Sequence, residues 1–101
     1  MVEEDTLENE VVEAELEIRN VDGLHMRPAM QFVDIANRFE SQITVSNDQT
    51  SIDGKSIMQI SMLAATCGAK LRIQAEGPDA RQAVKALREL VEEKHFDEPI
   101  P

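Results

Sequence analysis

The sequence predicts an α+β fold with strands and helices in the order β-α-β-β-α-β-α. Segments 11–18 and 69–77 alternate apolar and polar residues, as half-buried strands do. Segments 28–39 and 78–96 carry apolar residues at helical spacing. Each alternating strand has one solvent-exposed face and one apolar face. This pattern favours an antiparallel sheet whose apolar face is covered by the helices.

The first strand and helix follow from simple patterns. Four apolar side chains alternate with glutamates and face one side: Val12, Ala14, Leu16 and Ile18. Turn formers, "NVDG", then break the strand. Pro28 suits the first helical position, where its missing N–H costs nothing. The helix presents one apolar stripe, which consists of Ala29, Phe32, Val33, Ala36 and Phe39.

The middle of the chain reads as a hairpin followed by a short helix. Residues 41–53 form two strands joined by a turn at Asn47 and Asp48. The apolar run that follows is opened by Ser56 as N-cap and closed by Gly68 as the residue after the helix.

The last helix is expected to start at Pro78, with Asp79 in its first turn. Its stripe has i, i+3, i+4 and i+7 spacing and consists of Ala80, Ala83, Val84, Leu87, Leu90 and Val91. His95, near its end, is expected to be structural, and Cys67 to be a small packing residue.

Composition limits the function classes. The 101 residues suit one domain, and 42% hydrophobic residues suit a folded body. Eight of the 20 acids lie in residues 1–17, which contain no base, and the formal net charge is −10. A chain of this charge is not expected to bind nucleic acid. A single cysteine fits a reducing compartment, and the N-terminus shows neither a signal peptide nor a membrane span. We therefore expect a soluble cytoplasmic protein.

The motif "GLHMRPA", residues 23–29, carries the clearest chemistry. It places His25 beside the first turn of a helix, where free N–H groups and the helix dipole favour an anion. Arg27 adds a positively charged guanidinium group, whose N–H donors suit phosphate oxygens. A neutral imidazole is also a nucleophile. Together these residues describe a histidine that could accept a phosphoryl group and pass it on.

Other interpretations of the motif are weaker. His25 could simply be a helix-cap residue with its hydrogen bonds satisfied, and Arg27 a solvated side chain. This is the usual case for an isolated His-x-Arg. A metal site is not expected, because His25, His95 and Cys67 show no pairing at metal-ligand spacing. A hydrolase triad is not expected either, because no nucleophile elbow is evident.

The motif closely resembles the active-site signature of the HPr family, the histidine phosphocarriers of the bacterial phosphotransferase system. The resemblance continues through "DGKSIM" and "GAKLRIQAEGPDARQAVKAL" and covers roughly residues 12–95. It implies an open-faced β-sandwich, a four-stranded antiparallel sheet with three helices on one side. It also implies a carrier rather than an enzyme, without cofactor or metal and expected to be monomeric.

The resemblance assigns roles to the residues of the motif. His25 would take a phosphoryl group on Nδ1 from Enzyme I, whose donor is phosphoenolpyruvate, and deliver it to enzyme IIA domains. Arg27 would steady the phosphoryl group. Gly23 and Pro28 would shape the site, with Pro28 starting the helix. Asp22 stands where the family usually has a small polar residue, and its carboxylate could affect the imidazole or repel phosphate.

Ser56 has two compatible interpretations. Ser56 and Gln59 have the spacing of a capping box, so Ser56 could simply cap the short helix. In the family, the matching serine is phosphorylated in many lineages by HPr kinase/phosphorylase, which slows phosphorylation of the histidine. In other lineages the serine is present and unused.

Apolar residues near these two sites could dock partners. The resemblance places Met26, Ile57 and Met58 on the partner-binding surface, although Met at helical spacing is more usually core. Ile60 and Leu63 are expected in the core.

The predicted organisation is an acidic, disordered extension at 1–10, an HPr domain at 11–96 and a tail at 97–101. Two further functions remain open. One is a regulatory carrier, including nitrogen-type relays, that feeds kinases or transcription regulators. The other is a catabolite-repression type controlled through Ser56 alone, against which the presence of His25 argues.

Overall fold

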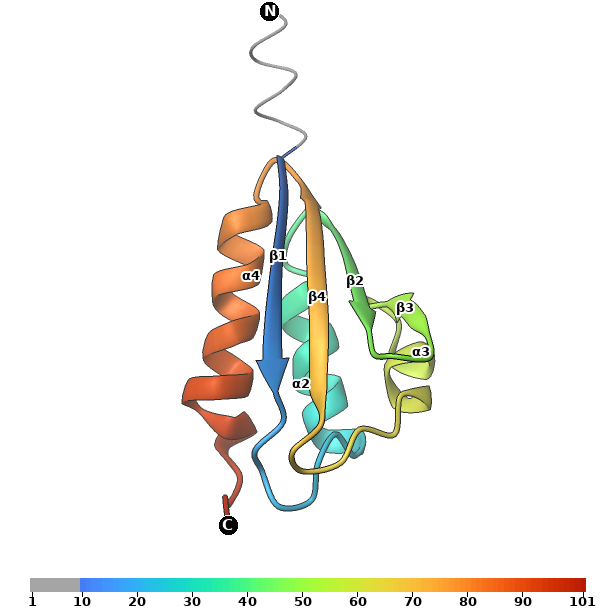
Figure 1. Ribbon diagram of the computed structural model, residues 1–101. Helices are drawn as coiled ribbons and strands as arrows, with labels where there is room; N and C mark the ends of the chain where they lie inside the picture. Colours follow the sequence, from blue (N-terminus) through green and yellow to red (C-terminus); the bar gives the residue numbers. More distant parts are fainter. Residues whose placement is uncertain (1–9) are drawn as a thin grey trace, which may run out of the picture.

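The fold is a four-stranded antiparallel sheet with its helices on one face (Figure 1). The computed structural model describes residues 10–101, so residues 1–9 of the disordered extension predicted at 1–10 lie outside the described residues. The prediction is wrong at Glu10, which belongs to the first strand and pairs with Gly77. The predicted element order and fold class are confirmed.

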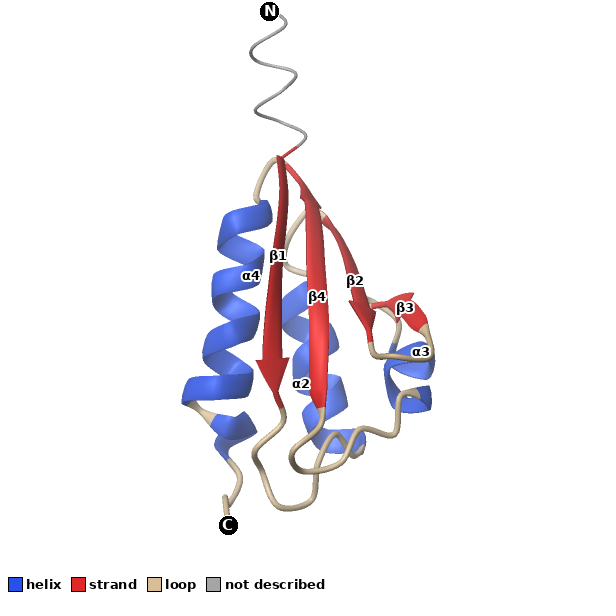
Figure 2. Ribbon diagram, in the orientation of Figure 1, coloured by secondary structure: helices blue, strands red, loops and turns tan. Residues whose placement is uncertain are grey.

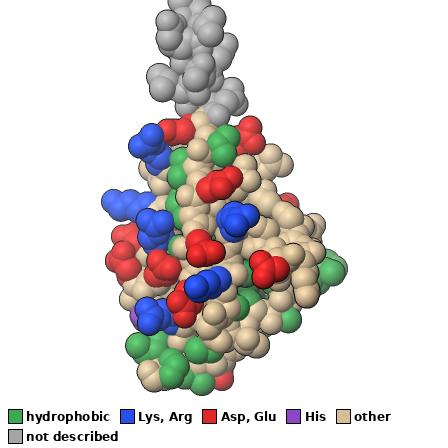
Figure 3. Space-filling view, viewed as in Figure 1, with side chains coloured by type: hydrophobic (Ala, Val, Ile, Leu, Met, Phe, Trp, Pro, Cys, Tyr) green, Lys and Arg blue, Asp and Glu red, His purple; other side chains and the backbone are tan. Residues whose placement is uncertain are grey.

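The strands lie in the spatial order β1-β4-β2-β3. Their bounds are Glu10–Glu17 for β1, Gln42–Ser46 for β2, Ser51–Asp53 for β3 and Lys70–Gly77 for β4. The predicted hairpin turn is confirmed, since the Asn47 carboxamide accepts hydrogen bonds from the N–H groups of Gln49 and Thr50. The open face of the sheet carries interspersed acidic and basic side chains (Figure 3), among them the cross-strand neighbours Glu15 and Arg72.

The helices are α2 (Met26–Ala36), α3 (Ile57–Met62) and α4 (Ala80–Arg88) (Figure 2). A π-helical turn, Glu89–Glu93, extends α4, and a final turn covers His95–Asp97. Helix α4 packs on β1, β4 and α2, and α2 packs on α3. None of the helices in the described part of the chain is long and apolar enough to cross a membrane.

The core is aliphatic and lies between the sheet and the helices. Alternate residues of the strands point into it as predicted, and Ile60 and Leu63 are buried, also as predicted. The largest fully buried apolar side chains are Phe96, Leu16, Ile18, Ile43, Ile60, Ile73 and Leu87.

Helix α2 differs from its prediction at both ends. It begins at Met26, so His25 is the N-cap and Pro28 is the third helical residue, not the first. Proline fits there because N–H groups of the first turn have no intrahelical acceptor. The helix ends at Ala36 and not at residue 39, because the Asn37 carboxamide donates to Val33 O and to Lys55 O, which closes the helix end.

The helix predicted between Ser56 and Gly68 ends at Met62, so Gly68 is not its terminating residue. Tertiary hydrogen bonds explain the early end. Ala65 O accepts from Leu24 N, and Gly68 N donates to Ile18 O, which aligns this segment with the loop after β1. A longer helix would lose both bonds. Cys67, predicted to pack, is exposed on this segment.

The last helix begins at Ala80, so the prediction that Pro78 starts it is wrong. Asp79 is its N-cap and not a first-turn residue, and its carboxylate does not cap the helix. Instead it accepts hydrogen bonds from Glu40 N, Ser41 N and Ser41 Oγ at 2.9, 2.9 and 2.6 Å. Asp79 thereby fixes the connection between α2 and β2 to the start of α4.

This arrangement makes Asp79 a pH-dependent stabiliser. Burial alone would raise the pKa of Asp79, but the hydrogen bonds from Ser41 and Glu40 outweigh burial and lower it. A lowered pKa means that the stabilisation is complete above the unfolded value, about 3.9, and is lost as pH falls below it. We expect Asp79→Asn to reduce the free energy of unfolding by about 1–2 kcal/mol at neutral pH.

Urea denaturation of both proteins at about pH 7 and about pH 3 measures this effect. The difference between wild type and Asp79→Asn should shrink at the lower pH. Asp34→Asn is the matched control, because Asp34 is exposed and pairs only with exposed Arg38, so its effect should stay within about 0.5 kcal/mol. A difference for Asp79→Asn that is equal at both pH values would contradict the ionic role of Asp79.

Candidate functional site

His25 lies at the N-cap of α2, at the end of the molecule where the loop after β1 meets the helix. Its backbone is extended, its carbonyl accepts from Ala29 N at 3.0 Å, and its side chain makes no capping hydrogen bond. The N–H groups of Met26 and Arg27 therefore have no intrahelical acceptor and remain available to an anion. The imidazole is 42% exposed, so a partner can reach it.

Gly23 shapes the loop that leads to His25. Its φ is +70°, in the left-handed region that favours glycine. A Cβ atom at this position would lie 2.6 Å from Ala65 O and 2.9 Å from Thr66 Cα. A side chain at residue 23 would thus push the loop off the segment after α3, and His25 would move with it.

The imidazole contacts a carboxylate that the sequence analysis did not identify. His25 Nε2 lies 3.0 and 3.1 Å from the two carboxylate oxygens of Glu98. The Glu98 side chain is 9% exposed. Burial would raise the pKa of Glu98, but hydrogen bonds from Asn20 and His25 and the charges of His25 and Arg27 outweigh burial and lower it. An ionised carboxylate can accept a hydrogen bond but cannot donate one. His25 Nε2 therefore carries the proton of the hydrogen bond to Glu98.

A left-handed turn delivers Glu98 to the site. His95, Phe96 and Asp97 have φ values of 50°, 56° and 57°, which are costly for residues other than glycine. Phe96 is fully buried within this turn, and its burial holds the strained backbone. After the turn, Val21 N donates to Pro99 O at 2.9 Å. The C-terminal residues thus contact the loop that precedes His25.

Asn20 joins the loop to the C-terminal segment. Its fully buried carboxamide donates from Nδ2 to Gly23 O at 2.8 Å and to Glu98 Oε1 at 2.9 Å. The same side chain therefore fixes both the turn that positions His25 and the carboxylate that contacts it.

Two charged side chains complete this end of the molecule. Arg27 is exposed on the first turn of α2, close enough to Glu98 to help lower its pKa. Asp22 is exposed, and one of its carboxylate oxygens lies within 4.8 Å of the ligand atoms of His25 and Glu98. The site thus combines one cationic side chain and two backbone donors with two carboxylates.

Ser56 lies on a different element and caps α3. Its Oγ accepts from Gln59 N at 3.2 Å, and its carbonyl accepts from Ile60 N. The predicted capping box is only half formed, because the Gln59 side chain accepts from Asp53 N instead of returning to Ser56. Ser56 N donates to Asp53 O.

Four methionines lie exposed on the two helices beside His25. Met26 and Met30 are one turn apart on α2 and are 56% and 58% exposed; Met58 and Met62 are one turn apart on α3 and are each 76% exposed. Ile57 is half-buried and, with Met30 and Val33, lines a shallow apolar hollow between the helices. We call these five residues, Met26, Met30, Ile57, Met58 and Met62, the methionine surface. Three of them, Met26, Ile57 and Met58, were predicted on a docking surface, whereas Met30 and Met62 were not.

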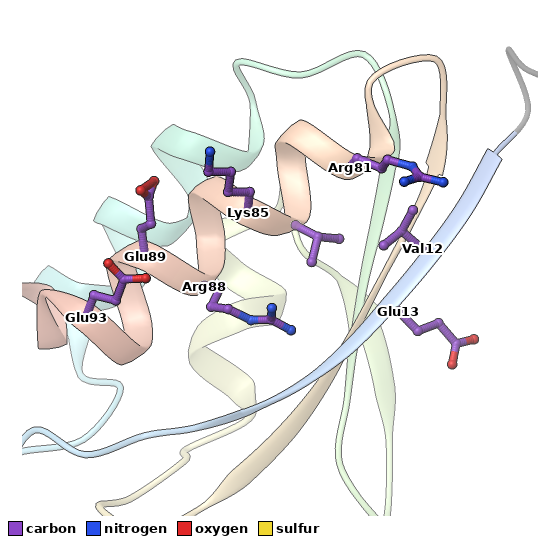
Figure 4. Close-up of a pocket in the computed structure, with 8 residues that line it drawn as sticks. Val12, Glu13, Arg81, Lys85, Arg88, Glu89 and Glu93 are labelled. Atoms are coloured by element: carbon purple, nitrogen blue, oxygen red, sulfur yellow. The ribbon is translucent and has the colours of Figure 1, made fainter.

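A further hollow is a groove between β1 and α4 (Figure 4). Val12 of β1 points toward a row of charged residues on α4 and the π-helical turn, which consists of Arg81, Lys85, Arg88, Glu89 and Glu93, whereas the Glu13 side chain points away from α4. Arg81 is engaged by Glu10 at 2.7 Å. The described lining holds no imidazole or thiol, and its charges are mixed, so this groove lacks the nucleophile that the His25 site has.

Asn20 and Glu98 are the functional residues that sequence reasoning missed. Glu98 is 73 residues from His25, and no spacing rule connects them. Asn20 was read only as a turn former, since nothing local indicates that its side chain is fully buried. The one available signal was the pair Phe96 and Pro99, apolar residues in a polar C-terminal segment that suggest a packed rather than a free end.

Comparison with known proteins agrees with this geometry. The family model described as "PTS HPr component phosphorylation site" matches residues 12–93. The "Phosphocarrier protein HPr" of Borreliella burgdorferi is 43% identical over 82 residues, which cover 81% of this chain and 95% of that protein. The "Multiphosphoryl transfer protein" of Salmonella typhimurium is 38% identical over 94 residues, covering 90% of this chain but 25% of that protein.

Solved structures give the same result. The crystal structure of HPr-C-His from Thermoanaerobacter tengcongensis superposes with a TM-score of 0.83 at 43% identity, and the match covers 88% of this chain and 99% of that one. The family match, the identity over most of both chains and the shared fold agree on one conclusion. The chain belongs to the HPr family of the phosphotransferase system.

Proposed function

We propose that His25 accepts a phosphoryl group on Nδ1 from phosphorylated Enzyme I and passes it to enzyme IIA domains. Family membership makes the chain a phosphocarrier rather than a catalyst. The observation that carries the assignment to His25 is its contact with Glu98. Because Nε2 donates its proton to that carboxylate, the lone pair of the neutral imidazole is on Nδ1.

The transfer step follows from this tautomer. The Nδ1 lone pair attacks the phosphorus of the donor, the bond between phosphorus and the donor atom breaks, and the bonding electrons leave with the donor. The positive charge that develops on the imidazole is stabilised by Glu98, which keeps its hydrogen bond to Nε2–H. The N–H groups of Met26 and Arg27 and the Arg27 guanidinium are available for the phosphoryl oxygens.

The methionine surface is the proposed contact area for both partners. Methionine is flexible and polarisable, so one apolar surface can adapt to several partner proteins. Because Met26 follows His25 directly, a partner bound there would hold its own phosphoryl donor or acceptor against the imidazole. Ile57 and Met58 extend the contact to α3, next to Ser56.

Ser56 is proposed as a regulatory phosphorylation site for a kinase of the HPr kinase/phosphorylase type. A phosphate there adds about −1.5 to −2 charges at the N-terminus of α3. The helix end tolerates this charge, so the fold would persist. The added charge would lie beside Ile57 and Met58 and disfavour partner docking.

Replacing His25 tests the proposed phosphoryl acceptor. His25→Ala should gain no phosphoryl group from Enzyme I and phosphoenolpyruvate, whereas wild type should gain one that brief acid treatment removes, as measured by intact mass. His95→Asn is the matched control, since asparagine tolerates the left-handed backbone of residue 95. This control should still be phosphorylated. Acid-labile phosphate on His25→Ala would contradict the assignment.

Replacing Glu98 tests its proposed effect on the imidazole of His25. Glu98→Gln keeps the shape of the side chain but removes the charge that fixes the proton on Nε2. We expect phosphoryl acceptance to slow by about 10-fold, the effect of roughly 1.4 kcal/mol in a charge-assisted hydrogen bond. Nitrogen NMR of the imidazole should also show protonated Nδ1. Glu93→Gln, an exposed glutamate in the π-helical turn, is the control. An unchanged rate and tautomer would remove Glu98 from the mechanism.

Two substitutions of Ser56 separate the effect of added charge from the effect of capping α3. Both Ser56→Asp and Ser56→Asn keep a good N-cap, but only the aspartate adds charge. Ser56→Asp should lower the rate of phosphoryl transfer to His25 severalfold, while Ser56→Asn should leave it near that of wild type. Equal rates for the two variants would argue against regulation by charge at residue 56.

A further inference from the structure

The loop after β1, the N-cap of α2 and the C-terminal segment bring together three side chains of metal-binding type. Asp22, His25 and Glu98 each offer one ligand atom, and these atoms all lie within 4.8 Å of one another. The sequence analysis found no set at metal-ligand spacing, because Glu98 is 73 residues from His25 and reaches the site only through the left-handed turn.

The geometry suits zinc. Tetrahedral zinc with nitrogen and oxygen ligands at about 2.0–2.1 Å places adjacent ligand atoms about 3.3 Å apart. The distances of 3.0 and 3.1 Å between His25 Nε2 and the Glu98 oxygens are close to this value. Asp22 is exposed, so its side chain can close the remaining distance at little cost. Water would occupy the fourth position.

One of the ligands is held in place beforehand. Glu98 is 9% exposed, and the fully buried Asn20 carboxamide donates to its Oε1 at 2.9 Å. Such outer hydrogen bonds orient ligating carboxylates and strengthen metal binding. An imidazole with two carboxylates favours zinc and related transition metals over magnesium and calcium, which prefer six or more oxygen ligands.

We propose that Asp22, His25 and Glu98 form a zinc site that competes with phosphorylation of His25. Zinc binds the lone pair of a neutral imidazole, so binding at Nε2 requires the ring proton to move from Nε2 to Nδ1 through solvent. Proton and charge balance within the ring, and no proton is released from it. The nitrogen proposed to attack phosphorus then carries a proton and has no lone pair, so zinc and the phosphoryl group exclude each other at His25.

Metal binding does not depend on the proposed function, whereas the competition rests on it. Zinc chloride titrated into the full chain by calorimetry, in a buffer that does not bind metal, tests the first part. We expect one zinc per chain and at least a 10-fold weaker affinity in each of Asp22→Asn, His25→Gln and Glu98→Gln.

Three control variants guard against other zinc ligands of this acidic chain. Cys67→Ser, His95→Asn and Glu93→Gln should bind zinc like wild type. If the three site variants bind zinc as tightly as wild type, or if Cys67→Ser abolishes binding, the site is overturned.

Nitrogen NMR and transfer assays test the competition. Zinc should move the His25 ring proton to Nδ1. At a zinc concentration about 10 times the wild-type Kd from calorimetry, phosphoryl acceptance should slow about 10-fold for wild type but only about twofold for Asp22→Asn. Equal slowing of Asp22→Asn would place the inhibition on Enzyme I and overturn the competition. So would normal transfer to zinc-loaded wild type. If wild type accepts no phosphoryl group even without zinc, the proposed function fails, while the calorimetric result still decides the metal site.

Discussion

The hydrogen bond between His25 Nε2 and Glu98 organises the functional end of this molecule. The Glu98 carboxylate is only 9% exposed and is ionised, so it determines which nitrogen of the His25 imidazole holds the proton. Its position depends on a strained left-handed turn, which persists because Phe96 is fully buried. Phe96 therefore connects core packing to chemistry: burial of an aromatic ring stabilises a backbone that, left to itself, would not place Glu98 beside His25.

The fold could be predicted from local patterns because each element has a clear period. Alternation identified both long strands, and the stripe from Ala80 to Leu87 identified α4. The errors lie at element ends. Asn37 closes α2, Ala65 and Gly68 pair with distant backbone and shorten α3, and Asp79 binds Ser41 instead of capping its own helix. In each case a tertiary hydrogen bond, invisible in the sequence, overrides a local preference.

The site was predictable only where it is local. His25, Arg27 and Pro28 lie within one helical turn, so the motif itself suggests a nucleophile beside backbone donors. Asn20 and Glu98 were missed because their roles come from burial and from the path of the chain after α4. The methionine surface was predicted only in part. The family resemblance placed Met26 and Met58 on an exposed surface, and the packing shows that these large apolar side chains, with Met30 and Met62, do remain exposed.

In the proposed function, the charges around His25 suit a phosphoryl group that must be both accepted and released. Arg27 and the free N–H groups of α2 attract a phosphoryl group, and a helix end contributes only about 0.3–1 kcal/mol per charge at an exposed position. The carboxylates of Asp22 and Glu98 lie near the same ring and repel the same anion. In the proposed transfer, Glu98 would compensate by stabilising the positive charge that develops on the imidazole. The Glu98 carboxylate therefore favours the positive ring of the proposed phosphorylated state, although its charge also repels the phosphate. Under the proposed function, an acceptor built this way would hold its phosphoryl group weakly enough for the next partner to remove it.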